Sequence, residues 1–232
     1  MMSGADALLE STAKEWQART GVSIYEVYGM TETVLITHGN PLGKSKIGSI
    51  GIPITNTMAA ILDPEVDTFL PPGEMGELVM AGPQVTKGYW NNPDATRDCE
   101  AVINGVRWWR SGDLGRMEED GYFYLYDRKR DLIKYKGLRV YAREVEEVLK
   151  THPQIKEVGV IGVRDPKVGE NVKAMVVLET DARGQLSELD IREYCKDHLA
   201  PYKIPKIVEF IGEIPKTDVG KVSRRELREE EL

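Results

Sequence analysis

The chain has 232 residues, of which 41% are hydrophobic and 30% are charged, and its formal net charge is -7. This length is typical of one or two domains with a substantial core. The negative charge disfavours nucleic acid as the main partner, because phosphate binding requires a basic face. No run approaches the roughly 18 apolar residues of a membrane span, and the first residues do not resemble a signal peptide. Cys99 and Cys195 are too few for a disulfide framework, so we expect a reduced, cytoplasmic protein.

The first 45 residues have the pattern of an α/β sheet. We expect a helix from Ser11 to Arg19, with Thr12 and Glu15 at capping-box spacing near its start. A strand is predicted over residues 22–27, followed by a loop that begins at Gly29.

The region from Ile47 to Tyr126 consists of short β-type runs separated by glycine, proline and asparagine. This spacing predicts an all-β subdomain of hairpins. Asn104-Gly105 and Asp120-Gly121 are the best candidates for tight turns, because both pairs tolerate positive φ angles.

The pattern after Asp131 is mixed α and β, which predicts a second domain. The expected elements are a helix over 142–150, strands over 155–163 and 172–178, a helix over about 188–199 capped by Ser187, a strand near 207–211 and a short helix from Ser223.

Six short motifs occur in order along about 200 residues. They are Tyr28-Gly29-Met30-Thr31-Glu32, Gly76-Glu77-Leu78 running to Gly88-Tyr89, Ser111-Gly112-Asp113-Leu114, Asp127-Arg128-Lys129-Arg130-Asp131, Lys134-Tyr135-Lys136-Gly137 and Gly220-Lys221. Each is weak alone, but the set resembles the C-terminal part of the adenylate-forming ligases, the family of acyl-CoA synthetases and firefly luciferase. The resemblance implies an α+β fold. Residues 1–129 would be the end of the large AMP-binding domain, with an α/β piece over 1–45 and a distorted β-barrel over 46–129, and residues 130–232 would be a mobile cap domain.

The same resemblance implies an activity. A parent enzyme would activate a fatty acid with ATP and Mg²⁺ to acyl-AMP and would then transfer the acyl group to coenzyme A. The sequence around Gly51-Ile52-Pro53 and Gly88-Tyr89-Trp90 is most similar to that of medium- or long-chain fatty-acid ligases. The sequence leaves open the length of the acyl chain, whether the acid is alkyl or aryl, and whether the acceptor is coenzyme A or a carrier protein.

The chain resembles only about the last two-fifths of such a ligase, and it contains no phosphate loop of the kind that the family carries upstream. We therefore expect a truncation, a proteolytic product or one piece of a split gene, inactive by itself. Its expected partners are fatty acid, ATP, coenzyme A, and either the missing N-terminal half or a second copy. Two alternatives stay open: a non-catalytic partner subunit or AMP-sensing module on the same fold, and a nucleic-acid-binding strip over 128–139.

The resemblance assigns the nucleotide to the first domain. Tyr28 would stack on adenine, with Gly29 beside it, Thr31 would bind phosphate, and Glu32 would hold Mg²⁺, which prefers a carboxylate together with phosphate oxygens. Asp113 would accept hydrogen bonds from the ribose hydroxyls, as suits a carboxylate. The further candidates are Arg128, also toward the ribose or phosphate, and Gly4, in a small-residue loop against adenine. The segment from Gly76 to Tyr89 is interpreted as structural, because its glycines permit turns and its apolar positions form core.

The second domain would carry the mobile machinery. Arg130 stands where the family has its hinge, since a solvated residue can absorb a large change in φ and ψ. Lys134 and Gly137 would lie on the hairpin that meets the site during thioester formation. Lys221 would lie on the opposite face and contact the α-phosphate and the substrate carboxylate during adenylation. A lone lysine in either position is ordinarily a solvent-exposed side chain, so both assignments depend on the surrounding motifs.

Overall fold

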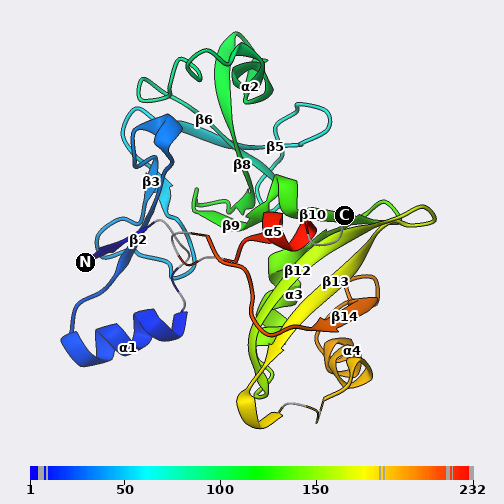
Figure 1. Cartoon of the computed structure of the whole chain (residues 1–232). Coiled ribbons are helices and arrows are strands. Elements are labelled where there is room, and N and C mark those ends of the chain that lie inside the picture. Colours follow the sequence, from blue (N-terminus) through cyan, green and yellow to red (C-terminus); the bar gives the residue numbers. More distant parts are fainter. Residues whose placement is uncertain are drawn as a thin grey trace. The chain divides into compact units, whose positions relative to one another are not determined.

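The structure, a computed structural model, describes residues 1–4, 8, 10–182, 184, 186–217, 220 and 222–229. The chain forms two compact units, Met1–Lys129 (unit 1) and Arg130–Leu232 (unit 2). Figure 1 shows the elements of both units in chain colours. No helix among the described residues is long and apolar enough to cross a membrane.

Unit 1 begins with a small sheet and one helix. The sheet has the strand order β1-β2-β3-β4, in which β1 and β2 are parallel and the other pairs are antiparallel. Its elements are β1 (Met2–Ser3), α1 (Glu10–Thr20), β2 (Tyr25–Tyr28), β3 (His38–Gly39) and β4 (Ile52–Pro53), with a 3-10 turn at Thr31–Thr33. These strands are short, and β2 ends at Tyr28, the first residue of the first motif.

A second, antiparallel sheet forms the rest of unit 1. Its strand order is β5-β6-β8-β7, and β9 pairs with β8. Its elements are β5 (Met58–Leu62), β6 (Gly76–Ala81), α2 (Pro93–Asp98), β7 (Glu100–Ile103), β8 (Val106–Met117) and β9 (Phe123–Arg128). Strand β6 is buried along its whole length. A bridge between Gly51 and Phe123 connects the segment before β4 to β9, so the two sheets of unit 1 are in contact.

Unit 2 is built on a five-stranded sheet with the order β11-β10-β13-β12, to which β14 adds in parallel next to β13. A 3-10 turn at Lys129–Asp131 spans the boundary between the units. The elements that follow are β10 (Leu132–Tyr135), β11 (Leu138–Tyr141), α3 (Ala142–Lys150), β12 (Ile155–Asp165), β13 (Gly169–Leu178), a 3-10 turn at Thr180–Ala182, α4 (Glu188–Lys196), β14 (Ile207–Phe210) and α5 (Arg224–Glu229). The long β12 and β13 form an antiparallel pair over most of their length.

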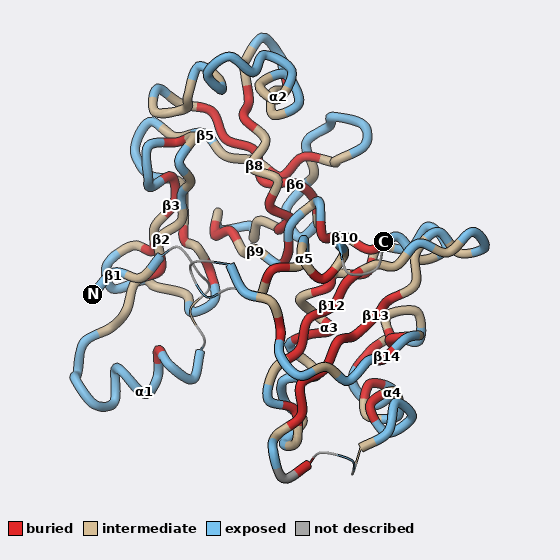
Figure 2. The backbone as a smooth tube through the Cα atoms, in the orientation of Figure 1, coloured by how far each residue is buried: buried red, intermediate tan, exposed pale blue. Residues whose placement is uncertain are grey.

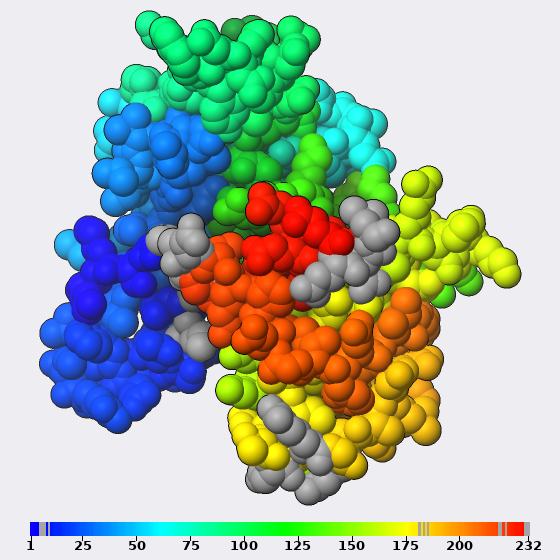
Figure 3. Space-filling view, in the orientation of Figure 1, coloured from blue at the N-terminus to red at the C-terminus, as the bar shows by residue number. Residues whose placement is uncertain are grey.

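The central strands of unit 2 are buried over part of their length, residues 158–161 of β12 and 172–178 of β13, as Figure 2 shows. One face packs against α3 and α4 through a large apolar cluster that includes Val145, Leu149 and Ile191. The other face packs against α5 through a smaller cluster that includes Ile161 and Leu227. Both faces of this sheet are therefore covered by helices. In Figure 3 the orange and red atoms of the last part of unit 2, up to α5, lie beside yellow and yellow-green atoms on the visible face of this unit.

Most of the predicted elements are confirmed. Helix α3 has the expected bounds, α4 begins after Ser187 with a complete capping box to Asp190, and Asn104-Gly105 forms the two-residue hairpin between β7 and β8. Both turn residues there have positive φ angles, 52° and 77°, as this type of turn requires. Gly121, with φ 83°, closes the turn between β8 and β9.

Three local predictions are wrong. The cap at Thr12 is wrong because α1 already begins at Glu10, whose carboxylate pairs with Lys14 one turn later. The first strand begins at Tyr25, three residues later than expected. The all-β prediction for Ile47 to Tyr126 missed helix α2, which begins because the Asn92 side chain accepts from the backbone N–H of Ala95 and Pro93 occupies the first helical position.

Candidate functional site

Strands β2, β8 and β9 of unit 1 bring three of the predicted nucleotide-binding residues together. The Tyr28 hydroxyl donates a hydrogen bond of 2.6 Å to Asp113 Oδ2, although 85 residues separate the two in the chain. Asp113 in β8 pairs directly with Arg128 in β9, and Arg128 Nε lies 3.2 Å from Asp113 Oδ1. We call Tyr28, Asp113 and Arg128 the aspartate cluster.

The environment of the aspartate cluster keeps Tyr28 protonated. Burial, followed by the charge of the Asp113 carboxylate, raises the pKa of Tyr28 well above its ordinary value. The hydroxyl therefore remains a donor at neutral pH. The Asp113 side chain is 13% exposed, whereas the Arg128 side chain is 57% exposed. The cluster thus has an open side through the guanidinium.

The turn at Ser111-Gly112 sets the position of Asp113. Gly112 has a φ of 72°, which only glycine adopts without strain. The backbone N–H of Asp113 donates to Ser111 Oγ at 3.0 Å, and Ser111 Oγ in turn donates to the Leu78 carbonyl at 2.8 Å. The motif is therefore a local bend that is tied to the neighbouring strand β6.

The residue after Tyr28 has to be glycine. A Cβ on Gly29 would lie 1.2 Å from the carbonyl oxygen of Leu35, because the loop that follows folds back against it. Val34 and Leu35 both have positive φ angles, 52° and 93°, which is unusual for such side chains. The first motif thus forms a tightly turned loop with Thr31 exposed and Glu32 half-buried.

Glu32 is in contact with the second motif. Tyr89 Oη donates to Glu32 Oε1 at 2.7 Å, and the backbone N–H of Thr86 donates to the Glu32 carbonyl at 2.7 Å. Sequence reasoning interpreted the Gly76–Tyr89 segment as structural and did not identify this contact. The motif spacing contains no signal for a bond across 57 residues.

A buried histidine lies under the aspartate cluster and was not selected from the sequence. The His38 ring packs edge-on against Tyr28 and Phe123, with centroid distances of 5.9 and 4.9 Å. Its Nδ1 lies 3.0 Å from Thr37 Oγ1, while its Nε2 has no hydrogen-bond partner within the described part of the chain. Burial lowers the pKa of His38 to about 3, so the imidazole is neutral at pH 7.

Gly4 lies next to the strand that carries Tyr28. A Cβ at Gly4 would lie 3.0 Å from both the Val27 side chain and its carbonyl, so this position favours a residue without a side chain. Gly4 follows β1, which pairs in parallel with β2. The adjoining residues 5–7 lie outside the described part of the chain.

Arg130 is flanked by two anchored neighbours. Before it, Lys129 Nζ binds the buried Glu77 carboxylate at 2.9 Å, and Arg110 binds the same carboxylate at 2.8 Å. After it, Asp131 is buried and accepts from Arg224 and Arg228 of helix α5 at 3.2 and 2.8 Å. Each neighbour is thus fixed within its own unit.

Of the two predicted site lysines of unit 2, Lys134 lies within the described residues and Lys221 does not. Lys134 is exposed on β10, and Lys136-Gly137, with φ angles of 50° and 78°, form the predicted hairpin turn to β11. Lys221 lies outside the described residues. The ends of its loop are joined by a bridge between Lys216 and Val222.

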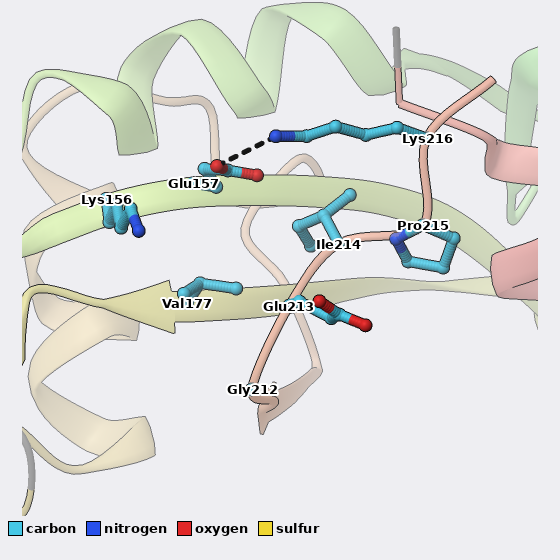
Figure 4. A pocket seen from close by; sticks show the side chains of 8 residues that line it. All are labelled: Lys156, Glu157, Val177, Gly212, Glu213, Ile214, Pro215 and Lys216. Carbon is cyan, nitrogen blue, oxygen red and sulfur yellow. Dashed lines mark hydrogen bonds and ion pairs between the residues drawn. The ribbon is translucent and has the colours of Figure 1, made fainter. Parts of the chain in front are cut away.

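A pocket of about 430 Å³ opens beside the base of that loop. Figure 4 shows Lys216 reaching across to Glu157, with 2.9 Å between Nζ and Oε1. It is lined by Lys156, Glu157, Val177, Gly212, Glu213, Ile214, Pro215 and Lys216, none of which was selected from the sequence.

Comparisons with known proteins identify the family. A model of the AMP-binding enzyme family matches residues 1–90, and a model of the AMP-binding enzyme C-terminal domain matches residues 144–221. A long-chain-fatty-acid--CoA ligase of Bacillus subtilis (strain 168) is 46% identical over 231 residues, covering 99% of this chain and 40% of the relative. A 2-succinylbenzoate--CoA ligase of Bacillus cereus is 40% identical, covering 90% of this chain and 42% of that protein.

The fold agrees with these matches. The crystal structure of ATP-bound MatB from Rhodopseudomonas palustris superposes with a TM-score of 0.87 at 35% identity, covering 99% of this chain and 44% of that one. The chain thus spans about 40% of the length of the curated relatives it matches. It belongs to the family of AMP-binding, adenylate-forming enzymes and matches their C-terminal portion.

Proposed function

We propose that this chain is the C-terminal portion of an AMP-forming acyl-CoA ligase that acts on a fatty acid. In such an enzyme the substrate carboxylate attacks the α-phosphate of ATP and releases pyrophosphate. The thiol of coenzyme A then attacks the acyl carbon and releases AMP. Chemistry of this kind requires positioning and charge neutralisation more than covalent help.

The aspartate cluster is the observation that carries the proposal. A half-open carboxylate, between a tyrosine that ends β2 and an arginine that ends β9, suits a nucleoside with a ribose diol. Asp113 would accept from the diol and the Tyr28 ring would pack on adenine. Arg128 would contact the ribose or phosphate, and Thr31 the phosphate. Gly29 and Gly4 would leave space for the close approach of the base.

Glu32 fits a role in holding Mg²⁺. No group of three or more histidine, cysteine, aspartate or glutamate side chains among the described residues could hold a metal ion by itself. A site with one carboxylate and several phosphate oxygens agrees with how Mg²⁺ is usually bound. When bound, the cation would neutralise charge on the phosphates, while Glu32 would hold it in place.

The roles in unit 2 complete the proposal. Arg130 would be the hinge, Lys134 and Gly137 would serve thioester formation with coenzyme A, and Lys221 would contact the α-phosphate during adenylation. In a ligase that includes the upstream part, Lys221→Ala should slow adenylation by about 10²–10³, and Lys134→Ala should slow only the second step. Equal losses in both steps for both variants would contradict the two roles.

The substrate class is supported by the relatives and not by a described pocket. Several of the matched proteins are long-chain-fatty-acid ligases, and one acts on 2-succinylbenzoate. We favour the fatty acid because the chain is 46% identical to the Bacillus subtilis long-chain-fatty-acid ligase and 40% identical to the 2-succinylbenzoate ligase. Incubation of the chain alone with ATP, Mg²⁺ and fatty acids should release no pyrophosphate; sustained release would contradict a need for the upstream phosphate loop.

The nucleotide site can be tested on this chain by calorimetry with AMP and with 2′-deoxy-AMP. Asp113→Asn keeps the shape and removes the charge, so AMP affinity should fall about 10-fold or more, and the preference for AMP over the deoxynucleotide should disappear. Asp127→Asn is the matched control, because Asp127 is also buried and lies opposite Leu114, the next residue of β8. An Asp113→Asn variant that keeps the preference for AMP would contradict the ribose role.

A further inference from the structure

Two hydrogen bonds connect the loop of Glu32 to the segment Thr86–Tyr89. The backbone N–H of Thr86 donates to the Glu32 carbonyl, and Tyr89 Oη donates to the Glu32 carboxylate, each at 2.7 Å. The same short segment therefore fixes both the position of Glu32 and the direction of its carboxylate. No described residue bonds to the second oxygen, Oε2.

Tyr89 is itself held in place by its surroundings. Its backbone N–H donates to Thr96 Oγ1 at 2.8 Å, and its ring lies edge-on to the fully buried Trp109, with 5.6 Å between the ring centroids. Gly88 has a φ of 145°, and a Cβ there would lie 2.6 Å from Thr96 Cγ2. The glycine thus permits a backbone course that presents the tyrosine to Glu32.

The properties of Tyr89 suit an orienting donor better than a core residue. The residue is 38% exposed, although its ring contacts the core at Trp109. Burial and the hydrogen bond to Glu32 raise the pKa of Tyr89, so the hydroxyl remains protonated at neutral pH. A protonated hydroxyl can only donate to a carboxylate, which fixes the direction of the bond.

We propose that Tyr89 is a positioning residue for Glu32: its hydroxyl occupies Oε1 and leaves Oε2 for the divalent cation that accompanies the nucleotide. This inference rests on the proposed function, because it assumes a cation at Glu32. A glutamate side chain without a fixed partner samples several rotamers, and a hydrogen bond to one oxygen reduces the entropy lost when the other binds a cation. The Gly88-Tyr89 motif would then orient a ligand in addition to forming a turn.

The test compares ATP binding to the 232-residue chain with Mg²⁺ and with EDTA, by calorimetry, for the unmodified protein, Tyr89→Phe and Tyr126→Phe. Tyr126 is the matched control, because it is 37% exposed in the same unit. Tyr89→Phe should weaken ATP binding about 10-fold when Mg²⁺ is present and leave it within about twofold in EDTA, the loss expected for one hydrogen bond to a charged group. Tyr126→Phe should change neither value.

The outcomes separate the inference from the proposed function. An equal loss with Mg²⁺ and with EDTA would show a merely structural role and overturn the inference, as would no loss at all. If the unmodified chain bound ATP with no enhancement by Mg²⁺, the cation role of Glu32 would be wrong, and the inference with it. Failure of the unmodified chain to bind any nucleotide would overturn the proposed function itself. Because Trp109 packs against Tyr89, tryptophan fluorescence shows whether the variant is folded.

Discussion

Two clusters of carboxylates and arginines in this protein share their chemistry and differ in their surroundings. In unit 1, Asp113 meets Arg128, whose side chain is 57% exposed. In unit 2, Asp131 and Glu146 meet Arg224, and these side chains are 6%, 4% and 16% exposed. The second group, together with Arg228, is the closed cluster; the aspartate cluster is the open one.

The closed cluster is fully engaged in holding its own unit together. Glu146 accepts from Arg224 Nε and Nη2 and also from the backbone N–H of Val160. These bonds connect α5 to α3 and β12 across unit 2. The open cluster is held by fewer described bonds and faces solvent through its guanidinium. The comparison teaches that burial, more than residue type, separates a structural ion pair from a candidate binding site.

The largest effect should follow from opening the closed cluster. Arg224→Ala would leave Glu146 and Asp131 buried with fewer compensating charges, so we expect a loss of about 3–5 kcal/mol in the stability of unit 2. Arg225→Ala is the matched control on the same helix, since the Arg225 side chain is 81% exposed, and it should cost less than about 0.5 kcal/mol. Urea unfolding followed by circular dichroism measures both.

All four tryptophans lie in unit 1, so tryptophan fluorescence follows that unit alone. The fluorescence transition should stay in place in Arg224→Ala while the circular dichroism transition moves. Equal unfolding midpoints for the Arg224 and Arg225 variants would show that the closed cluster contributes no more to stability than an exposed ion pair.

The second-largest effect concerns His38, the buried histidine that packs against Tyr28 of the open cluster. The pKa of His38 is about 3, against an ordinary value of 6.5. The unfolded chain therefore binds a proton that the folded chain does not, between these two values, and stability falls as the pH is lowered through this window. From pH 6.5 to 4.5 the loss from His38 should reach about 2 kcal/mol.

His38→Asn should remove this part of the pH dependence from the fluorescence transition, measured against urea at several pH values. His198→Asn, at an exposed position of unit 2, serves as the control and should leave the profile of unit 1 unchanged. A pH profile that is identical in His38→Asn and the unmodified chain would contradict a neutral, buried imidazole.

A smaller effect is expected from the tyrosine of the open cluster. Tyr28→Phe removes the hydrogen bond to Asp113 but leaves Arg128 beside the carboxylate, so unit 1 should lose about 1–2 kcal/mol. The fluorescence transition in urea measures this loss. No shift beyond that of the control Tyr126→Phe would mean that solvent replaces the hydroxyl fully and that the cluster is more open than its 2.6 Å bond indicates.

The smallest effect sharpens the comparison directly. Arg128→Ala should change the stability of unit 1 by less than about 1 kcal/mol, because an exposed ion pair is well screened by water. It is the same substitution as Arg224→Ala, beside the same type of carboxylate. If both arginines cost the same in urea unfolding, burial would not be what distinguishes the two clusters.

Local pattern predicted the elements of unit 2 well and those near the start of unit 1 less well. Helix α3 has an apolar stripe with a clear period, and β12 and β13 are long apolar runs, so propensity and burial agree there. Helix α2 was missed because Asn92-Pro93 suits both a turn and the start of a helix, and only the bond to Ala95 distinguishes them. The strands of the first sheet are too short for periodicity to place their ends.

The candidate site was predictable as a set of residues and not as a set of contacts. Motif order selected Tyr28, Asp113 and Arg128, which the structure brings together. It did not select Tyr89, whose bond to Glu32 depends on a loop closing over 57 residues. His38 was passed over because a lone histidine carries no local pattern; its neutrality comes from burial against Tyr28 and Phe123.

The anchored neighbours of Arg130 limit how much slack the connection between the units has. Lys129 is tied to Glu77, and Asp131 to Arg224 and Arg228, so only a few rotatable backbone bonds lie between the two ties. Insertion of one glycine after Arg130 would keep both ties and lengthen the connection by one residue. The number of residues between the ion pairs of Lys129 and Asp131, more than the type of residue at position 130, can then be changed by design.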